Sequence, residues 1–69
     1  MDEKEKAILA LADRLKAGIA RAARQGASDA ALLRMEKDAA KQVRRVCKQL
    51  GLPESVADLW YPEPTRGRQ

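Results

Sequence analysis

Apolar residues recur every three or four positions along most of this chain. Between Ser28 and Gly51 they fall at Leu32, Met35, Ala39, Val43, Val46 and Leu50. This spacing follows the 3.6-residue period of an α-helix, so one side of the segment is apolar. Ser28 can accept hydrogen bonds from the first free amides, and Gly51 followed by Pro53 is typical of a helix end. The pattern predicts a helix over residues 29–50.

A second apolar stripe precedes this segment. Its large members are Ile8, Leu11, Leu15 and Ile19. Asp2, followed three residues later by Glu5, resembles a capping box at a helix start. Gly18 lies on the packing side, where the missing side chain allows a neighbouring helix to approach closely, and a merely tolerated glycine is the alternative. The stripe predicts a helix over about residues 3–25.

The two predicted helices are joined by only a few residues, which forces them to run antiparallel. After the second helix, Val56, Leu59 and Trp60 share one face of a short helix over about residues 53–60, which ends before Pro62. We therefore predict an all-α fold, an antiparallel α-helical hairpin with a short C-terminal helix. It forms a single helical domain over residues 1–61, followed by a flexible tail over residues 62–69.

The core of such a small fold needs additional stabilisation. A chain of 69 residues buries only about 60% of its unfolded surface. The single cysteine, Cys47, excludes an intramolecular disulfide, and the absence of histidine argues against a structural zinc site. Apolar residues such as Leu9 and Leu33 flank the main stripes, so the apolar arc is wider than a two-helix seam requires.

Oligomerisation is the remaining means of stabilisation, and we expect a homodimer in which two hairpins form a four-helix bundle. The alternative is intrachain: the short helix folds back over the hairpin and completes a three-helix monomer. The seam residues that serve the core and the dimer are Ile8, Leu11, Leu15, Ile19, Leu32, Met35, Val43, Val46 and Leu50.

The composition argues against catalysis. The chain has no histidine, its glycines form no phosphate-binding loop, and Glu36 and Asp38 lie two apart on a helix and cannot face each other. We expect no enzymatic activity, no cofactor and no metal. Cys47 is best interpreted as a small buried hydrophobic residue, and an intermolecular disulfide or redox switch is the alternative.

The same composition argues against membrane insertion. No run of 18 apolar residues occurs, and the first residues are acidic and polar, unlike a signal peptide. A cytoplasmic location with a reduced thiol is the expectation, without a membrane partner.

Leu59, Trp60 and Tyr61 are the candidate contacts to a protein partner, because they include both aromatic side chains of the chain. The alternative for Trp60 is packing onto the hairpin near Leu50 and Leu52. We interpret the chain as a small non-enzymatic interaction module that binds and modulates a partner protein. Such a size is typical of accessory proteins of bacteria and phages.

A nucleic-acid-binding regulator is the alternative function, because the formal net charge is +4. The candidate residues are Arg14, Arg21, Arg24, Lys37 and Lys41. No aromatic residue lies among them, which argues against stacking on single-stranded bases, and an ordinary solvated helix face is the competing interpretation. The antiparallel arrangement also predicts that Arg44, Arg45 and Lys48 lie beside the acidic start of the chain.

Overall fold

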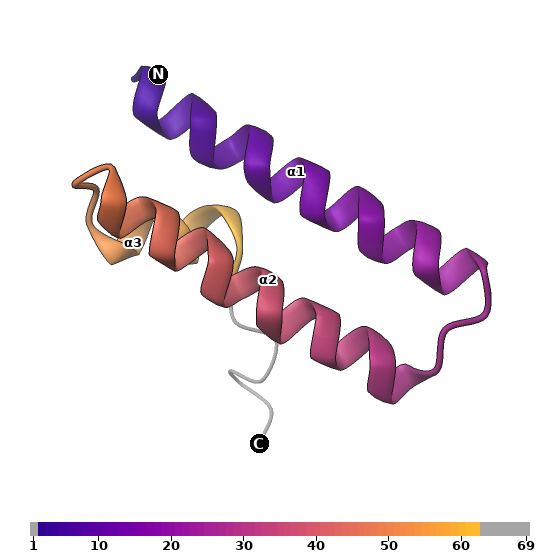
Figure 1. The fold of residues 1–69 in the computed structure, drawn as a ribbon. Helices are drawn as coiled ribbons and strands as arrows, with labels where there is room; N and C mark the ends of the chain where they lie inside the picture. Colours follow the sequence, from indigo (N-terminus) through magenta and orange to yellow (C-terminus); the bar gives the residue numbers. More distant parts are fainter. Residues whose placement is uncertain (1, 63–69) are drawn as a thin grey trace.

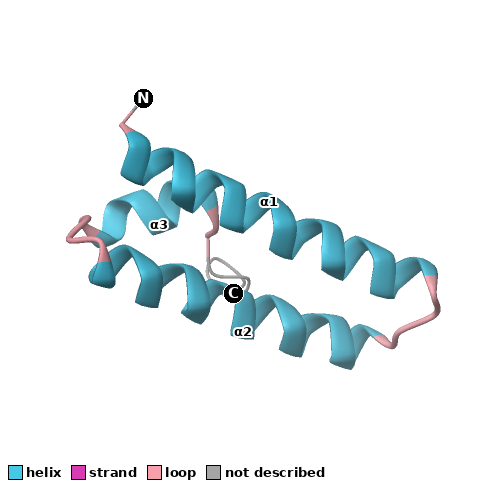
Figure 2. Cartoon of the chain, turned by 45° about the horizontal axis from the view of Figure 1, so that its top comes forward, coloured by secondary structure: helices cyan, strands magenta, loops and turns pink. Residues whose placement is uncertain are grey.

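The computed structural model describes residues 2–62, and this part of the chain contains three helices and no strand. The helices are α1 (Glu3–Arg24), α2 (Asp29–Gln49) and α3 (Glu54–Trp60). α1 and α2 run antiparallel, and α3 folds back across one side of the hairpin at the end away from the turn (Figures 1 and 2). The predicted hairpin with a short C-terminal helix is confirmed, with helix boundaries within one residue of the expected positions. Most of the predicted tail, residues 63–69, lies outside the described residues.

Two of the three helix starts have a side-chain cap. The Asp2 carboxylate accepts a hydrogen bond from the Lys4 amide at 3.4 Å, and the Ser28 hydroxyl accepts one from the Ala31 amide at 3.1 Å. These caps satisfy amides that have no partner within their helices. Pro53 precedes α3 in an extended conformation and is its N-cap, so the helix begins at Glu54, one position after the expected start at Pro53.

The two long helices end on glycines with positive φ, +94° at Gly26 and +76° at Gly51. A residue with a side chain rarely adopts this left-handed conformation, whereas glycine does so without steric cost. At the end of α2 the Leu52 amide donates a hydrogen bond to the Cys47 carbonyl at 2.9 Å. This bond is typical of the Schellman motif and turns the chain back toward α3.

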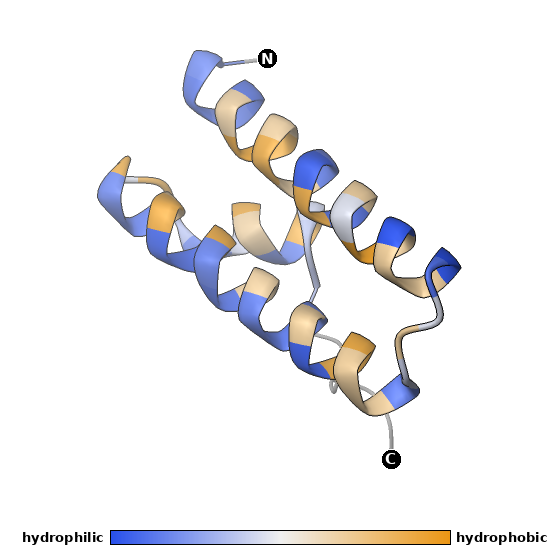
Figure 3. Ribbon diagram, turned by 45° about the vertical axis from the view of Figure 1, so that its right-hand side comes forward, coloured by the Kyte–Doolittle hydropathy of each residue, from blue (hydrophilic) through white to orange (hydrophobic). Residues whose placement is uncertain are grey.

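All three helices contribute to the core. Its buried apolar residues are Ile8, Ala12, Ala39, Ala40, Val43, Cys47, Val56, Ala57 and Tyr61. Figure 3 shows hydrophobic and hydrophilic positions alternating along both long helices, as the stripes predicted. The third helix thus packs on the hairpin in the way that the intrachain alternative proposed. Cys47 is 1% exposed, which confirms that it is a small buried residue.

Burial decreases from the α3 end of the hairpin toward the turn. Ile8 and Val43 are fully buried where α3 crosses, whereas Leu32 and Met35, nearer the turn, are only half-buried. Gly18 is exposed, and a Cβ added there would meet no atom within 4 Å. The close helix approach expected at Gly18 is therefore not made within this chain. The remaining seam residues are half-buried and pack against the core: Leu11, Leu15, Ile19, Val46 and Leu50.

Candidate functional site

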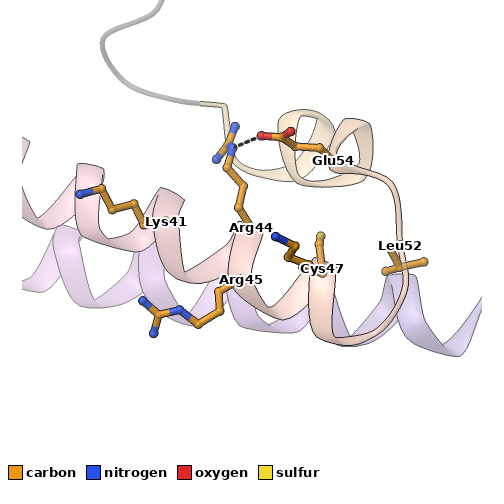
Figure 4. Close-up of a pocket in the computed structure, with 7 residues that line it drawn as sticks. Lys41, Arg44, Arg45, Cys47, Leu52 and Glu54 are labelled. Carbon is orange, nitrogen blue, oxygen red and sulfur yellow. Dashed lines mark ion pairs between the residues drawn. The ribbon is translucent and has the colours of Figure 1, made fainter.

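Arg44 of α2 connects the hairpin to α3. Its side chain is only 14% exposed, and its Nη1 donates hydrogen bonds to the Ala40 carbonyl at 3.1 Å and the Tyr61 carbonyl at 3.3 Å. Its Nε lies 3.5 Å from the Glu54 carboxylate (Figure 4), and its Nη2 pairs with Asp58. One guanidinium therefore holds both acidic residues of α3 and the carboxyl end of that helix. Charge-assisted bonds of this kind are stronger than bonds between neutral groups.

The antiparallel hairpin brings the end of α2, where Arg44, Arg45 and Lys48 lie, to the same end of the molecule as the acidic start of α1 (Figure 1). The ion pairs of Arg44 are nevertheless made with α3, a partner that the sequence analysis did not propose. Arg45 and Lys48 are exposed and form no ion pair with any residue of the described range 2–62. The sequence did carry a signal, because Glu54 and Asp58 lie four apart and share one face of their helix.

The predicted protein-binding residues have different environments. Tyr61 is 5% exposed, its ring centroid is 5.8 Å from the Lys16 amino group, and its pKa is raised, first by burial and then by the charge of Glu36. Trp60 is half-buried against the core, and its Nε1 is a buried donor with no hydrogen-bond partner among residues 2–62. Leu59 is 69% exposed. Of the three side chains, only that of Leu59 is mostly available to another molecule.

A groove runs between α1 and α2 on the side of the hairpin that α3 does not cover. It has a volume of about 280 Å³ and is lined by Arg14, Leu15, Gly18, Ile19, Met35, Asp38, Ala39 and Gln42. Lys16 faces Tyr61 on the α3 side of α1. Successive residues of a helix are rotated by about 100°, so residues two positions apart point in nearly opposite directions. Arg14 and Gly18, two positions before and after Lys16, therefore point to the side away from α3. We call this feature the α1–α2 groove.

The walls of the α1–α2 groove combine apolar and charged side chains. Leu15, Ile19 and Met35 are half-buried there, so part of their apolar surface remains in contact with water. Arg14 and Asp38 are exposed on opposite walls, and neither forms an ion pair within the described part of the chain. The groove therefore offers an apolar floor between a basic wall on α1 and an acidic wall on α2.

A second cavity lies between α2 and the start of α3. It has a volume of about 590 Å³ and is lined by Lys41, Arg44, Arg45, Cys47, Lys48, Leu52 and Glu54 (Figure 4). Basic side chains dominate its wall. Burial raises the pKa of the Cys47 thiol, and the nearby positive charge of Arg44 opposes that shift only in part. A buried thiol of this kind is a poor nucleophile.

The five residues expected to contact nucleic acid are all exposed, but they do not form one surface. Arg14 lines the α1–α2 groove, whereas Lys41 lines the cavity beside α3. These two features lie on different sides of the hairpin. The other three residues, Arg21, Arg24 and Lys37, line neither of these two features.

Among residues 2–62, no group of three or more histidine, cysteine, aspartate or glutamate residues is arranged to hold a metal ion. None of the three helices is long and apolar enough to cross a membrane. Neither a protein-family model, nor a curated protein, nor a solved structure matches this chain.

Proposed function

We propose that this chain is a small non-enzymatic interaction module of the cytoplasm that acts as a homodimer and binds and modulates a partner protein. The observation that carries the proposal is the α1–α2 groove, whose apolar side chains are not covered by α3. When a second surface excludes water from a half-buried apolar surface, the free energy falls by about 25 cal/mol for each Å² of apolar area. The occupant that we propose for the groove is a second copy of the chain.

Charge complementarity supports a second copy. A two-fold axis parallel to the helices places α1 of each copy against α2 of the other, which completes a four-helix bundle. Arg14 and Asp38 line the same groove. In the dimer, Arg14 of each copy meets Asp38 of the other, so two ion pairs form at the rim. Gly18 leaves open space in the same wall, which allows the other helix to approach closely.

The protein partner is proposed to contact α3. Leu59 projects from this helix with 69% of its surface exposed, and half-buried Trp60 lies beside it. Tryptophan is among the residues enriched in interface hot spots, and the exposed leucine extends the apolar surface beside it. Because α3 packs on the side of the hairpin away from the groove, the homodimer and the partner complex can form together.

A charge-exchange cycle tests the dimer. We expect Arg14→Glu and Asp38→Lys each to weaken self-association several-fold. Either substitution replaces both ion pairs of the symmetric dimer by pairs of like charges. The double variant should restore it, as measured by dissociation constants from sedimentation equilibrium. Arg24→Glu, an exposed change outside the groove, is the control and should have little effect. A double variant weaker than either single variant would exclude this pairing of the two copies.

Photo-crosslinking tests the partner site. A photoreactive amino acid replaces Leu59 in the full chain and, as a control, replaces exposed Lys6 on α1. The proposal expects a discrete crosslinked protein from position 59 that is absent from position 6. Crosslinks at position 59 that join only copies of this chain contradict a separate protein partner on α3.

A further inference from the structure

The exposed basic residues of α2 follow one side of the helix. They are Arg34, Lys37, Lys41, Arg45 and Lys48, and successive members are three or four positions apart. Residues at this spacing are neighbours on a helix surface. From the first to the last member the helix rises by about 21 Å at 1.5 Å for each residue. We call these five residues the basic track.

No member of the basic track forms an ion pair within the described residues, and all five are exposed. Asp38 lies at the edge of the track and lines the α1–α2 groove, while Glu54 and Asp58 pair with Arg44. Arg44 thus holds the acids of α3, and the neighbouring basic groups remain available.

Shape and composition indicate the ligand. A straight row of charges about 21 Å long matches an extended polyanion better than a compact anion, since each nucleic-acid strand carries a phosphate for about every 3.4 Å of duplex length. No aromatic side chain lies in the track, so it cannot stack on the bases of a single strand. It also lacks the apolar anchor that an acidic peptide segment needs for a specific interface.

We propose that the basic track binds the phosphate backbone of double-stranded nucleic acid without reading its sequence. The site differs from the set expected from the sequence. It keeps Lys37 and Lys41, adds Arg34, Arg45 and Lys48, and leaves out the arginines of α1. This binding is independent of the dimer and of the contact at Leu59. No track residue lines the α1–α2 groove, and Leu59 does not line the cavity that Lys41, Arg45 and Lys48 share with the start of α3.

The test is fluorescence anisotropy of a labelled mixed-sequence duplex with the full chain, at salt concentrations from about 50 to 200 mM. Five phosphate contacts predict a slope of about −4.5 in a plot of log affinity against log salt, at about 0.9 for each contact. The triple variant Lys41→Gln, Arg45→Gln, Lys48→Gln should lower affinity at least about tenfold at low salt and reduce the slope by about 2.7. Circular dichroism verifies that each protein is folded.

The control is a second triple variant with the same loss of net charge, Lys4→Gln, Lys6→Gln, Arg24→Gln, at exposed positions of α1. It should bind the duplex within about twofold of the unmodified chain, since it leaves every proposed phosphate contact in place. Equal losses in the two triple variants mean that net charge alone attracts the duplex, and they overturn the proposal.

Two competitors complete the test. Tighter binding of a single strand than of the duplex overturns the assignment of the ligand. Polyglutamate is compared with unlabelled duplex at equal charge concentration. If the two displace the labelled duplex equally well, the track is assigned to acidic proteins instead. Displacement by unlabelled duplexes of any sequence, with weak competition from both other polymers, supports the proposal. The mass of the chain in solution is a separate measurement, so failure here leaves the proposed dimer untouched.

Discussion

At the scale of single residues, Arg44 joins the hairpin to α3 through a hydrogen bond to Tyr61 and ion pairs with Glu54 and Asp58. We expect Arg44→Met to lower the free energy of unfolding by about 1–3 kcal/mol, because it removes a charged donor to the Tyr61 carbonyl and leaves two carboxylates without their partner. Most of this effect comes from the hydrogen bonds, since the Glu54 side chain is 74% exposed and solvent screens its ion pair. Urea denaturation followed by circular dichroism measures the change.

Arg45 provides the control for this substitution, because it is the next residue, exposed and without an ion pair in the described region. Arg45→Met should change the free energy of unfolding by less than about 0.5 kcal/mol. Equal effects of the two substitutions would show that Arg44 does not anchor α3.

Two other residues make stability depend on pH. Burial favours the neutral forms of Cys47 and Tyr61 and raises their pKa values above the ordinary 9.0 and 10.0. The stabilisation is complete below these ordinary values and is lost as the pH rises through the folded-state pKa values. We predict that the melting temperature falls as the pH rises above about 9. Tyr61→Phe should reduce the fall of the melting temperature above about pH 10, because the ring remains but no longer titrates. If the substitution leaves the pH profile unchanged, other groups cause the fall.

At the scale of the helices, the boundaries were predictable because local chemistry determines them. Asp2 and Ser28 cap the two long helices, and Gly26 and Gly51 end them in left-handed conformations. The position of α3 was not predictable in the same way. Its apolar face requires cover, and the hairpin and a second chain both offer it. The spacing of Glu54 and Asp58 predicts an acidic face on this helix but does not identify Arg44 as its partner.

Gly18 gives a prediction at this scale. Because a Cβ there meets nothing within 4 Å in the single chain, Gly18→Ala should stabilise the isolated hairpin by about 0.5–1 kcal/mol through helix propensity. If a second copy packs at the α1–α2 groove, the same substitution should weaken self-association. Denaturation at low concentration and sedimentation at high concentration separate the two effects. Ala17→Gly, on the exposed side of α1, should lower stability without changing association.

At the scale of the whole molecule, the position of α3 determines which surfaces are available. It covers one side of the hairpin at the end away from the turn, and leaves the α1–α2 groove on the other side. No member of the basic track of α2 lines the groove, and Lys41, Arg45 and Lys48 line the cavity between α2 and the start of α3. The flanking residues Leu9 and Leu33, on which the predicted apolar excess rested, do not line the groove, whose apolar floor consists of the main-stripe residues Leu15, Ile19 and Met35. The division of the basic residues into distinct surfaces was not predictable from the sequence, because it requires the rotation of each helix relative to α3.

The most direct test of the proposed function is the mass of the full chain in solution, measured by sedimentation equilibrium over a wide range of concentrations. The homodimer predicts a mass that approaches twice 7.6 kDa as the concentration rises. Met35→Glu, which places a charge in the groove, should retain its helicity and sediment as a single chain. An unmodified chain that sediments at 7.6 kDa throughout the range would contradict self-association through this groove.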